Sequence, residues 1–406
     1  MTTIAPNLTD IDRFVRDEHH EMLAWLREND PVHWHPTDDA GAGFWALTRY
    51  SDVAAAYLDN ATFQSSGGAM LGGSFRNEAD TAANRMLVSS DPPRHRLLRQ
   101  VVHRAFAPDI AAEVGRQVAR LVAKAVDDAL AAGGCDFATA IATELPAGAL
   151  MAMVGIDHKD AHHLIGLTRQ MIGFRDPAFV DTASDDRLRL AMIQAEIFEF
   201  FDDLRRERRR RPGTDLVSIL VKSEVNGRPL TDEEILYNCM NVAVGGNETT
   251  SHSASAGMIA MTEHPDAWRR LKEDPQGLLD LTINEILRWS STNAYVQRIL
   301  ARDVQLGGKL LRQGDSVTLW SVSANRDDRQ FTDPWTFRID RSPNRHLSFG
   351  SGIHRCIGAM LAHIELTALL RCLIDRDVAF ALDGEVRRVR SNFILGFTTV
   401  PLSLRS

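Results

Sequence analysis

The sequence predicts a mainly α-helical protein with a small β part, and the spacing of its apolar residues supports this fold class. Apolar residues recur at helical spacing in six segments, 110–132, 144–155, 187–209, 232–263, 265–273 and 276–289. Alternating apolar and polar residues, typical of strands, are confined to the stretches PVHWH, GFWALTRY, AYVQRILARDVQL and FILGFTTVPLSL. Because strands are predicted near both chain ends and no linker divides the chain, we expect the two ends to meet in one sheet and residues 1–406 to form one domain.

The composition is that of an ordinary globular protein. The 406 residues are 44% apolar and 25% charged, with a net charge of −8, so a large core is available and nucleic acid is a poor partner. The first twenty residues, MTTIAPNLTDIDRFVRDEHH, lack the apolar core of a signal peptide or a membrane span. We therefore expect a cytoplasmic protein without a membrane anchor. The four cysteines contain no CxxC pair, which argues against a disulfide framework.

Two polar stretches are interpreted as helix surface. The arginine run from Arg205 to Arg211 stops at a Pro-Gly break, and cations suit the C-terminal end of a helix. A solvated helix end therefore explains the run better than a nucleic-acid patch. His162 and His163 are likewise interpreted as exposed positions on a helix.

The segment 232–263 predicts an unusually long helix with a weakened centre. Thr231 and Glu234 form a capping-box pattern at its start, and helical spacing continues for about 30 residues. At its centre stands MNVAVGGNETT, whose two glycines each cost about 1 kcal/mol relative to alanine. Missing side chains there would let a flat group lie against the backbone, and threonine hydroxyls can bond carbonyls one turn back. The alternative is close packing against another helix, with Glu248 solvated.

A second unusual stretch is RHLSFGSGIHRCIGAMLAHIE, residues 345–365. Its glycine-containing loop delivers Cys356 to the predicted first turn of a helix, near His354 and Arg355. A helix N-terminus and neighbouring cations favour the thiolate, which is the form that binds a metal or acts as a nucleophile. The alternative is a buried structural cysteine, which leaves the glycine loop unexplained. The apolar face of this helix is predicted to be Ile357, Met360, Leu361 and Ile364.

The cysteine stretch resembles the haem-binding signature of a known family. Its pattern is Phe349-x-x-Gly352-x-x-x-Cys356-x-Gly358, which is similar to that of the cytochrome P450 monooxygenases. Two further motifs of that family stand upstream in the expected order: an ExxR pair, Glu285-Ile286-Leu287-Arg288, and an oxygen-activation motif, Gly246-Asn247-Glu248-Thr249. The resemblance covers about residues 10 to 406. It implies the cytochrome P450 fold, with haem b (iron protoporphyrin IX) between the long central helix and the cysteine loop.

The resemblance also implies roles for individual residues. Cys356 would be the metal ligand, and Glu248 and Thr249 would be the catalytic pair that delivers protons. Glu285 and Arg288, with Arg341 or His346 as a third partner, would support the haem-binding core. Residues implied to contact the haem, four of them as donors to its two propionates, are His95, Arg99, Gly246, Arg298, Phe349, His354, Cys356 and Gly358.

The implied reaction is hydroxylation, epoxidation or oxidative coupling of a medium-sized apolar molecule, such as a secondary-metabolite intermediate. The substrate would be free or attached to a carrier protein. Electrons would come from a separate ferredoxin and ferredoxin reductase. By correspondence with the family, the substrate pocket would be lined by Met70, Leu71, Phe75, Met86, Phe174, Val244, Asn293, Ala294, Val296, Phe393 and Ile394.

Two other functions are compatible with parts of the sequence. One is a haem-thiolate protein that senses or carries a ligand without oxygenating it; the glutamate and threonine of the oxygen-activation motif argue against this. The other is a haem-free enzyme that uses Cys356 as a nucleophile, which would require a base beside the thiol. Haem content and oxygen-dependent turnover distinguish the three.

Overall fold

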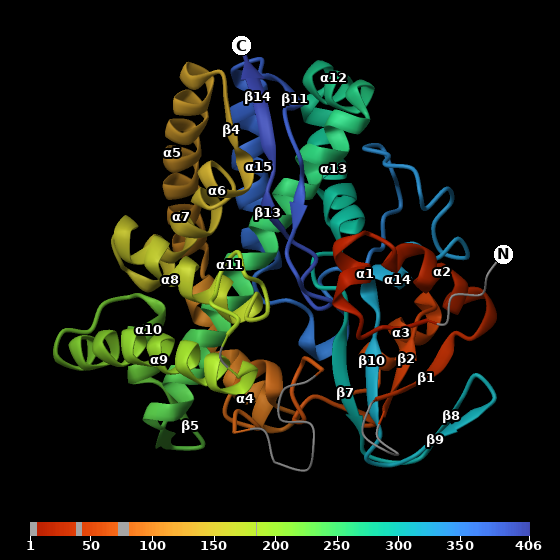
Figure 1. Cartoon of the computed structure of the whole chain (residues 1–406). Helices are drawn as coiled ribbons and strands as arrows, with labels where there is room; N and C mark the ends of the chain where they lie inside the picture. The colour runs from red at the N-terminus through yellow and green to blue at the C-terminus, as the bar shows by residue number, and fades with distance from the viewer. Residues whose placement is uncertain (1–5, 38–42, 72–80, 184) are drawn as a thin grey trace.

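A computed structural model describes residues 6–37, 43–71, 81–183 and 185–406. Figure 1 shows helices packed together on one side and a smaller sheet-rich part on the other, where the N-terminal helices lie. The predicted fold class, mainly helical with a small β part, is confirmed. The six helices expected from apolar spacing are all present: α5 (Pro108–Ala132), α7 (Glu144–Val154), α9 (Asp186–Arg210), α11 (Asp232–Glu263), α12 (Pro265–Glu273) and α13 (Pro275–Ser290).

The remaining helices are mostly shorter. In the N-terminal half they are α1 (Ile11–Val15), α2 (His19–Asn29), α3 (Tyr50–Leu58), η1 (Leu87–Ser89), α4 (Arg94–Val102), η2 (His103–Phe106), α6 (Phe137–Ala140) and α8 (His158–Ile172). In the C-terminal half they are α10 (Leu216–Lys222), α14 (Ser321–Ala324), η3 (Gly352–His354) and α15 (Ala359–Asp375). Helices α5, α7, α11 and α15 pack together into the main apolar core, where Gly148 of α7 lies so close to α5 that a Cβ would clash with Val118 at 2.7 Å.

The largest sheet has the order β1-β2-β10-β7-β3, built from β1 (Val32–Pro36), β2 (Gly43–Leu47), β10 (Ser316–Leu319), β7 (Val296–Leu300) and β3 (Phe63–Gln64). Its pairs are antiparallel except for β10 and β2, which are parallel. A second sheet has the order β11-β14-β4, from β11 (Ala379–Leu382), β14 (Pro401–Arg405) and β4 (Gly134–Asp136). Two-stranded pairs are β12 (Arg387–Arg388) with β13 (Phe397–Thr399), β5 (Glu224–Val225) with β6 (Arg228–Pro229), and β8 (Val304–Leu306) with β9 (Lys309–Leu311).

The expectation that both chain ends join one sheet is wrong. The N-terminal strands β1 and β2 belong to the five-stranded sheet, whereas the C-terminal strand β14 pairs with β11 and β4. The C-terminal segment instead reaches the N-terminal part through single hydrogen bonds, such as Asn392 Nδ2 to the Leu8 carbonyl at 2.9 Å. Strand pairing depends on contacts between distant segments, which periodicity does not report.

The long helix α11 begins as predicted. The Thr231 hydroxyl accepts a hydrogen bond from the Glu234 N–H at 3.2 Å, and the Glu234 carboxylate accepts one from the Thr231 N–H at 2.9 Å. These two bonds satisfy donors that a helix N-terminus leaves free. The helix then continues for 32 residues without interruption, so the paired glycines at its centre do not end it.

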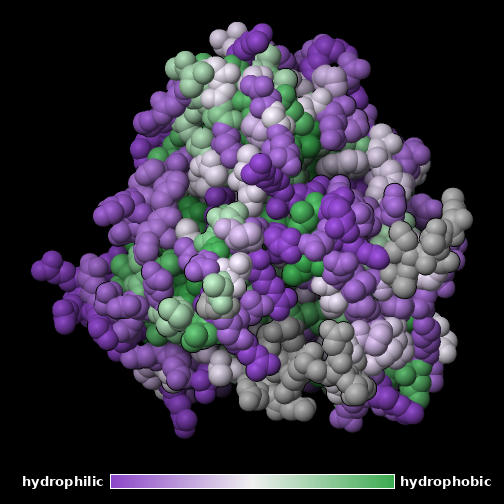
Figure 2. Space-filling view, in the orientation of Figure 1, coloured by the Kyte–Doolittle hydropathy of each residue, from purple (hydrophilic) through white to green (hydrophobic). Residues whose placement is uncertain are grey.

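The arginine run closes α9 and is held by carboxylates. Arg205 lies 2.5 Å from Asp202, Arg208 lies 3.0 Å from Asp215, and Arg209 pairs with Asp232. These pairs leave less free positive charge than the sequence suggests, which fits its interpretation as a helix end. In the described part of the chain one stretch, Phe137–Val154, has the length and hydropathy of a membrane span, and 67% of it is buried inside the protein. Figure 2 shows a largely hydrophilic face with apolar side chains gathered in patches.

Candidate active site between the long helix and the cysteine loop

A cavity of about 300 Å³ lies inside the helical part. The centre of α11 borders it with Gly245, Gly246 and Thr249, and the cysteine loop borders it with Phe349 and Cys356. The two unusual stretches of the sequence, about 100 residues apart, therefore face one cavity. Helix α7, η1 and α15 complete much of the wall.

The cysteine loop is shaped by glycines and by one backbone hydrogen bond. Gly350 and Gly352 have φ values of +62° and +67°, in the left-handed region that favours glycine. At Gly352 a Cβ would also lie 2.5 Å from the Tyr57 carbonyl oxygen, so a larger residue does not fit. The Cys356 N–H donates to the Phe349 carbonyl at 2.8 Å and closes the loop. The sulfur is thereby presented to the cavity.

Cys356 precedes α15 instead of lying within its first turn, since the helix begins at Ala359. The prediction that the surroundings of Cys356 favour its thiolate is met only in part. Burial within the protein raises the pKa of the Cys356 thiol above its ordinary value, although the residue is exposed toward the cavity, and hydrogen bonds from the N–H groups of Gly358 and Ala359 and the charge of Arg99 offset this only in part. A metal cation would supply the missing stabilisation of the thiolate. Met360, placed on the apolar face of the helix from the sequence, is 48% exposed.

The part of α11 that borders the cavity has no side chains at its two central glycines. A Cβ at Gly246 would meet no other atom within 4 Å, so the glycine leaves the helix backbone bare toward the cavity. The alternative reading, close packing of a second helix at these glycines, is therefore wrong. The Thr249 hydroxyl donates to the Gly245 carbonyl at 2.9 Å, the back-bond expected from the sequence. This bond fixes the threonine oxygen at the cavity wall.

Glu248 faces the other side of α11 and does not line the cavity. Its carboxylate accepts a hydrogen bond from the Thr168 hydroxyl of α8 at 3.1 Å and lies 3.2 Å from His252 Nε2. Arg169 Nε is 4.0 Å away. His252 Nδ1 in turn accepts from the Phe397 N–H at 3.3 Å, which assigns the ring proton to Nε2. The glutamate is therefore buried in a polar network rather than solvated, and α8 and His252 were not anticipated from the sequence.

Four nitrogen-bearing side chains gather at one edge of the cavity. Arg99, Arg298 and His354 line it, and His95 lies behind them with its ring centroid 4.2 Å from that of His354. Burial lowers the pKa of His95 to about 4 and that of His354 to about 2.

Most of these four side chains have no carboxylate among their hydrogen-bond partners. His95 Nε2 is buried without a hydrogen-bond partner, and Arg298, only 5% exposed, donates to the carbonyl of Gln297. Arg99 Nη2 donates to the Arg355 carbonyl, and His354 Nε2 lies 3.0 Å from the Ser65 hydroxyl. The buried charge of Arg298 and the buried, unpartnered Nε2 of His95 both require a compensating polar group. The donors at this edge therefore fit a bound group that carries carboxylates, which is what the haem propionates would supply.

Glu365 of α15 also lines the cavity and was missed by sequence reasoning. Its side chain is 3% exposed, and burial raises its pKa to about 8, partly offset by a hydrogen bond from Thr250 of α11. One carboxyl oxygen, Oε2, has no hydrogen-bond partner. The sequence signal was an acid within an apolar helical stretch, Ala362 to Leu370, which could have indicated a buried carboxyl.

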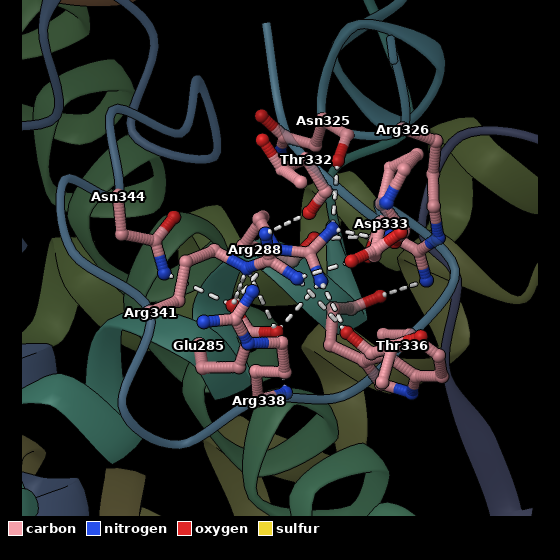
Figure 3. Close-up of polar contacts among 12 residues, drawn as sticks. Glu285, Arg288, Asn325, Arg326, Thr332, Asp333, Thr336, Arg338, Arg341 and Asn344 are labelled. Carbon is pink, nitrogen blue, oxygen red and sulfur yellow. Dashed lines mark hydrogen bonds and ion pairs between the residues drawn. The ribbon is translucent and has the colours of Figure 1, made fainter.

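Figure 3 shows the contacts around the ExxR pair. The fully buried Glu285 accepts hydrogen bonds from Arg288 at 2.7 and 2.8 Å, from Arg341 Nε at 3.0 Å and from Asn344 at 3.0 Å. Arg341 is therefore the third partner, and His346 is not. Arg288 also donates to the carbonyl of Asn325 at 2.9 Å.

The ExxR pair is connected to the cysteine loop through Asn325. The Asn325 side chain bonds the Leu347 N–H at 2.7 Å and the Ser348 hydroxyl at 2.9 Å. These residues immediately precede Phe349, where the loop begins. The buried ion pair thus supports the segment that presents Cys356.

The predicted substrate residues fall into three groups. Asn293 and Val296 line the cavity. Phe75 lies outside the described residues. The remaining eight do not line the cavity. Ala294 and Ile394 are buried, and Leu71 and Phe393 pack on the core around Tyr295 and Trp320. The other four are Met70, Met86, Phe174 and Val244. The observed apolar lining comes instead from residues whose proximity depends on tertiary packing, namely Leu87, Val88, Ala149, Leu150, Met153 and Val242.

Comparisons with known proteins agree with this architecture. The family model described as cytochrome P450 matches residues 44–376. The chain is 30% identical to linalool 8-monooxygenase of Pseudomonas putida, covering 98% of each chain, and 34% identical to a methyl-branched lipid omega-hydroxylase of Mycobacterium tuberculosis, covering 97% of this chain and 92% of the relative. A solved Mycobacterium marinum cytochrome P450 in complex with pseudoionone superposes with a TM-score of 0.89 at 30% identity, with 99% of each chain covered.

Proposed function

The chain belongs to the cytochrome P450 family of haem-thiolate monooxygenases, and from this premise we propose that it oxygenates a medium-sized apolar small molecule in the cavity between α11 and the cysteine loop. The observation that carries the proposal is that one cavity brings together a presented cysteine, a bare stretch of helix backbone and a threonine hydroxyl. These are the parts that thiolate-ligated haem and oxygen activation require.

The residues around the cavity fit haem b. Cys356 would ligate the iron through its thiolate, and Phe349, Gly358 and Gly246, which all line the cavity, would lie against the ring. His95, Arg99, Arg298 and His354 would bind the propionates, which would add anionic partners to this edge, including one for the unpartnered His95 Nε2. When bound, haem supplies the iron centre at which dioxygen is reduced and one oxygen atom is transferred to the substrate.

In this proposal both Thr249 and Glu248 take part in proton transfer. The Thr249 hydroxyl, held by the Gly245 carbonyl, has lone pairs free to accept and pass on a proton at the cavity wall. The carboxylate of Glu248, the residue before Thr249, lies on the side of α11 that faces α8, where His252 and Thr168 donate hydrogen bonds to it. Rotation of the Glu248 side chain would bring the carboxylate from this network toward the cavity, so its contribution depends on how easily the contacts to α8 are released.

The lining of the cavity favours a mostly apolar substrate with a polar group. Leu87, Val88 and Val242 provide apolar surface, while Asn241 and Asn293 provide hydrogen-bonding side chains. Relatives named for linalool and for a methyl-branched lipid fit the same description. Hydroxylation of such a compound is the proposed reaction, and the compound could be an intermediate of antibiotic biosynthesis, the process in which the structural neighbour OxyD is involved. The proposal includes a substrate attached to a carrier protein as well as a free one.

We further propose that the enzyme works in the cytoplasm with a separate ferredoxin and ferredoxin reductase. Arg96 on α4 and Arg104 on η2 are exposed, and α4 contacts the cysteine loop through the bond from Arg99 to the Arg355 carbonyl. Exposed cations near the thiolate side suit an acidic electron donor. Arg94 is less available to an acidic donor, because its guanidinium pairs with Glu234 of α11.

The test is oxygen-dependent turnover of a substrate found by a spectral-shift screen, with a surrogate ferredoxin and reductase. Thr249→Val should uncouple NADPH consumption from product formation, because the hydroxyl at the cavity wall is lost. Thr262→Val is the matched control, since the Thr262 hydroxyl makes a similar bond on the same helix, 2.7 Å from the Ile259 carbonyl, and does not line the cavity. Haem-loaded protein that binds ligands but consumes no NADPH would support a ligand sensor instead, and haem-free protein inactivated by thiol alkylation would support a cysteine nucleophile.

A further inference from the structure

A cluster of two histidines and one glutamate lies outside the cavity, where α7 and α8 begin. Glu144 is the first residue of α7, and His158 and His162 lie one turn apart on α8. The Glu144 carboxylate is 2.9 Å from Nε2 of each histidine, and the two ring centroids are 4.5 Å apart. The sequence interpretation of His162 as plain helix surface is therefore incomplete, because its ring is turned toward a carboxylate.

We propose that Glu144, His158 and His162 form a binding site for a divalent transition metal of the Zn²⁺ class. Two histidines four residues apart on a helix present their ring nitrogens on the same side, and a carboxylate is a common third ligand of zinc. The three ligand atoms lie within 4.8 Å of one another. With metal–ligand bonds of about 2.0–2.1 Å, tetrahedral ligand atoms are about 3.3 Å apart. The 2.9 Å contacts, from His158 Nε2 to Oε2 and from His162 Nε2 to Oε1, are a few tenths of an ångström shorter than this spacing.

The charges around the cluster also suit a cation. As metal ligands, two imidazoles and one carboxylate would together carry a net charge of −1, which suits a divalent cation. The side chains of His158 and His162 are 47% and 34% exposed, which leaves a route for the metal and room for water as a fourth ligand. Lys124 of α5 interacts electrostatically with Glu144, but its ammonium group is paired with Asp128.

The other cluster of this kind in the described residues is less suitable. Asp17, His19 and His20 also have ligand atoms within 4.8 Å of one another. There, however, Arg388 Nη2 already lies 3.0 Å from the Asp17 carboxylate, so a guanidinium occupies the anionic ligand. The cluster at the start of α7 and α8 has no arginine on its carboxylate among the described contacts.

A metal at this position would join the first turns of two helices that matter to the active site. Helix α7 lines the cavity with Ala149, Leu150 and Met153, and α8 carries Thr168, which bonds Glu248. Because both imidazoles and the carboxylate belong to helix ends, binding would restrain the start of α8 relative to α7. We therefore assign the site a structural role, and we expect zinc to raise the melting temperature.

The experiment uses the haem-loaded protein without an affinity tag, stripped of metals with EDTA and then freed of EDTA. Isothermal titration with zinc chloride should show one equivalent that is lost or weakened more than about 100-fold in His158→Ala/His162→Ala, because loss of even outer-shell partners costs 10–100-fold. His163→Ala is the matched control: it removes the adjacent histidine, whose ring lies near Phe200, and should leave zinc binding and the zinc-dependent rise in melting temperature unchanged.

The proposal is wrong if the wild type takes up no zinc, or if the double variant binds it with the same stoichiometry and affinity. The Soret absorbance of the double variant reports whether it has folded. If it has not, zinc K-edge absorption spectroscopy of the wild type decides the question. Two imidazole nitrogens and carboxylate oxygen around the zinc support the site, and sulfur or all-water coordination overturns it.

Discussion

Replacing Glu365 with glutamine should make the stability of the protein less dependent on pH. Burial raises the pKa of this carboxyl to about 8, whereas a glutamate in an unfolded chain titrates near 4.5. Between these values the folded protein binds a proton that the unfolded chain has released. The contribution of this protonated carboxyl to stability is therefore fully present below about pH 4.5 and is lost as pH rises through about 8.

The size of the effect follows from the shift. Each pH unit in this window changes the free energy of unfolding by at most about 1.4 kcal/mol, so the wild type should lose up to about 4 kcal/mol between pH 5 and pH 8 through this group. Glutamine resembles the protonated carboxyl in shape and cannot titrate, so E365Q should be close to the wild type at pH 5 and clearly more stable at pH 8.

Urea denaturation followed by circular dichroism at pH 5, 6, 7 and 8 measures the difference. Glu273→Gln, at an exposed position, is the control and should follow the wild type at every pH. Parallel pH profiles for the wild type and E365Q would refute the reasoning. They would mean that Glu365 is ionised in the folded protein and is stabilised by a partner.

Three further changes test the site. Glu285→Gln should lower the free energy of unfolding by about 3–5 kcal/mol and reduce haem retention, because two buried arginines lose their anionic partner. A loss of stability as small as that expected for Glu273→Gln, about 0.5 kcal/mol or less, would contradict this. Gly246→Val should leave circular dichroism melting unchanged, since a Cβ there meets open space, but should abolish ligand-induced spectral shifts; retained shifts would show that ligands bind elsewhere. Arg96→Glu with Arg104→Glu should slow reduction by ferredoxin more than about tenfold at low salt, and unchanged stopped-flow rates would exclude this docking surface.

Features with a local cause were predictable from the sequence. The capping box at Thr231 and Glu234 fixes where α11 begins, and the glycine pair opens the helix toward the cavity. The cysteine loop was also predictable, because left-handed glycines and a presented cysteine are encoded within one short stretch. The family resemblance left Arg341 and His346 as alternatives for the third partner of the ExxR pair, and only the folded contacts select Arg341.

Features that depend on distant segments were not predictable. The two chain ends enter different sheets because strand pairing is set by tertiary contacts. Glu248 is turned toward α8, since Thr168 and His252 offer it hydrogen bonds that a solvated position would not need. The thiol pKa of Cys356 is raised, because burial outweighs the nearby N–H groups. Most predicted substrate residues do not line the cavity, as with Ala294, which packs beside Tyr295, and periodicity does not show which face of a segment meets the cavity.

The central claim is that Cys356 presents a thiolate to haem in the cavity opposite α11. The most direct test is the absorption spectrum of the reduced protein exposed to carbon monoxide, recorded beside Cys356→Ala and, as a control at a buried cysteine away from the cavity, Cys239→Ala. A strongly red-shifted Soret band in the wild type and Cys239→Ala, lost in Cys356→Ala, is the predicted result. The same red-shifted band persisting in Cys356→Ala, or no haem in wild-type protein expressed with ample haem, would contradict the claim.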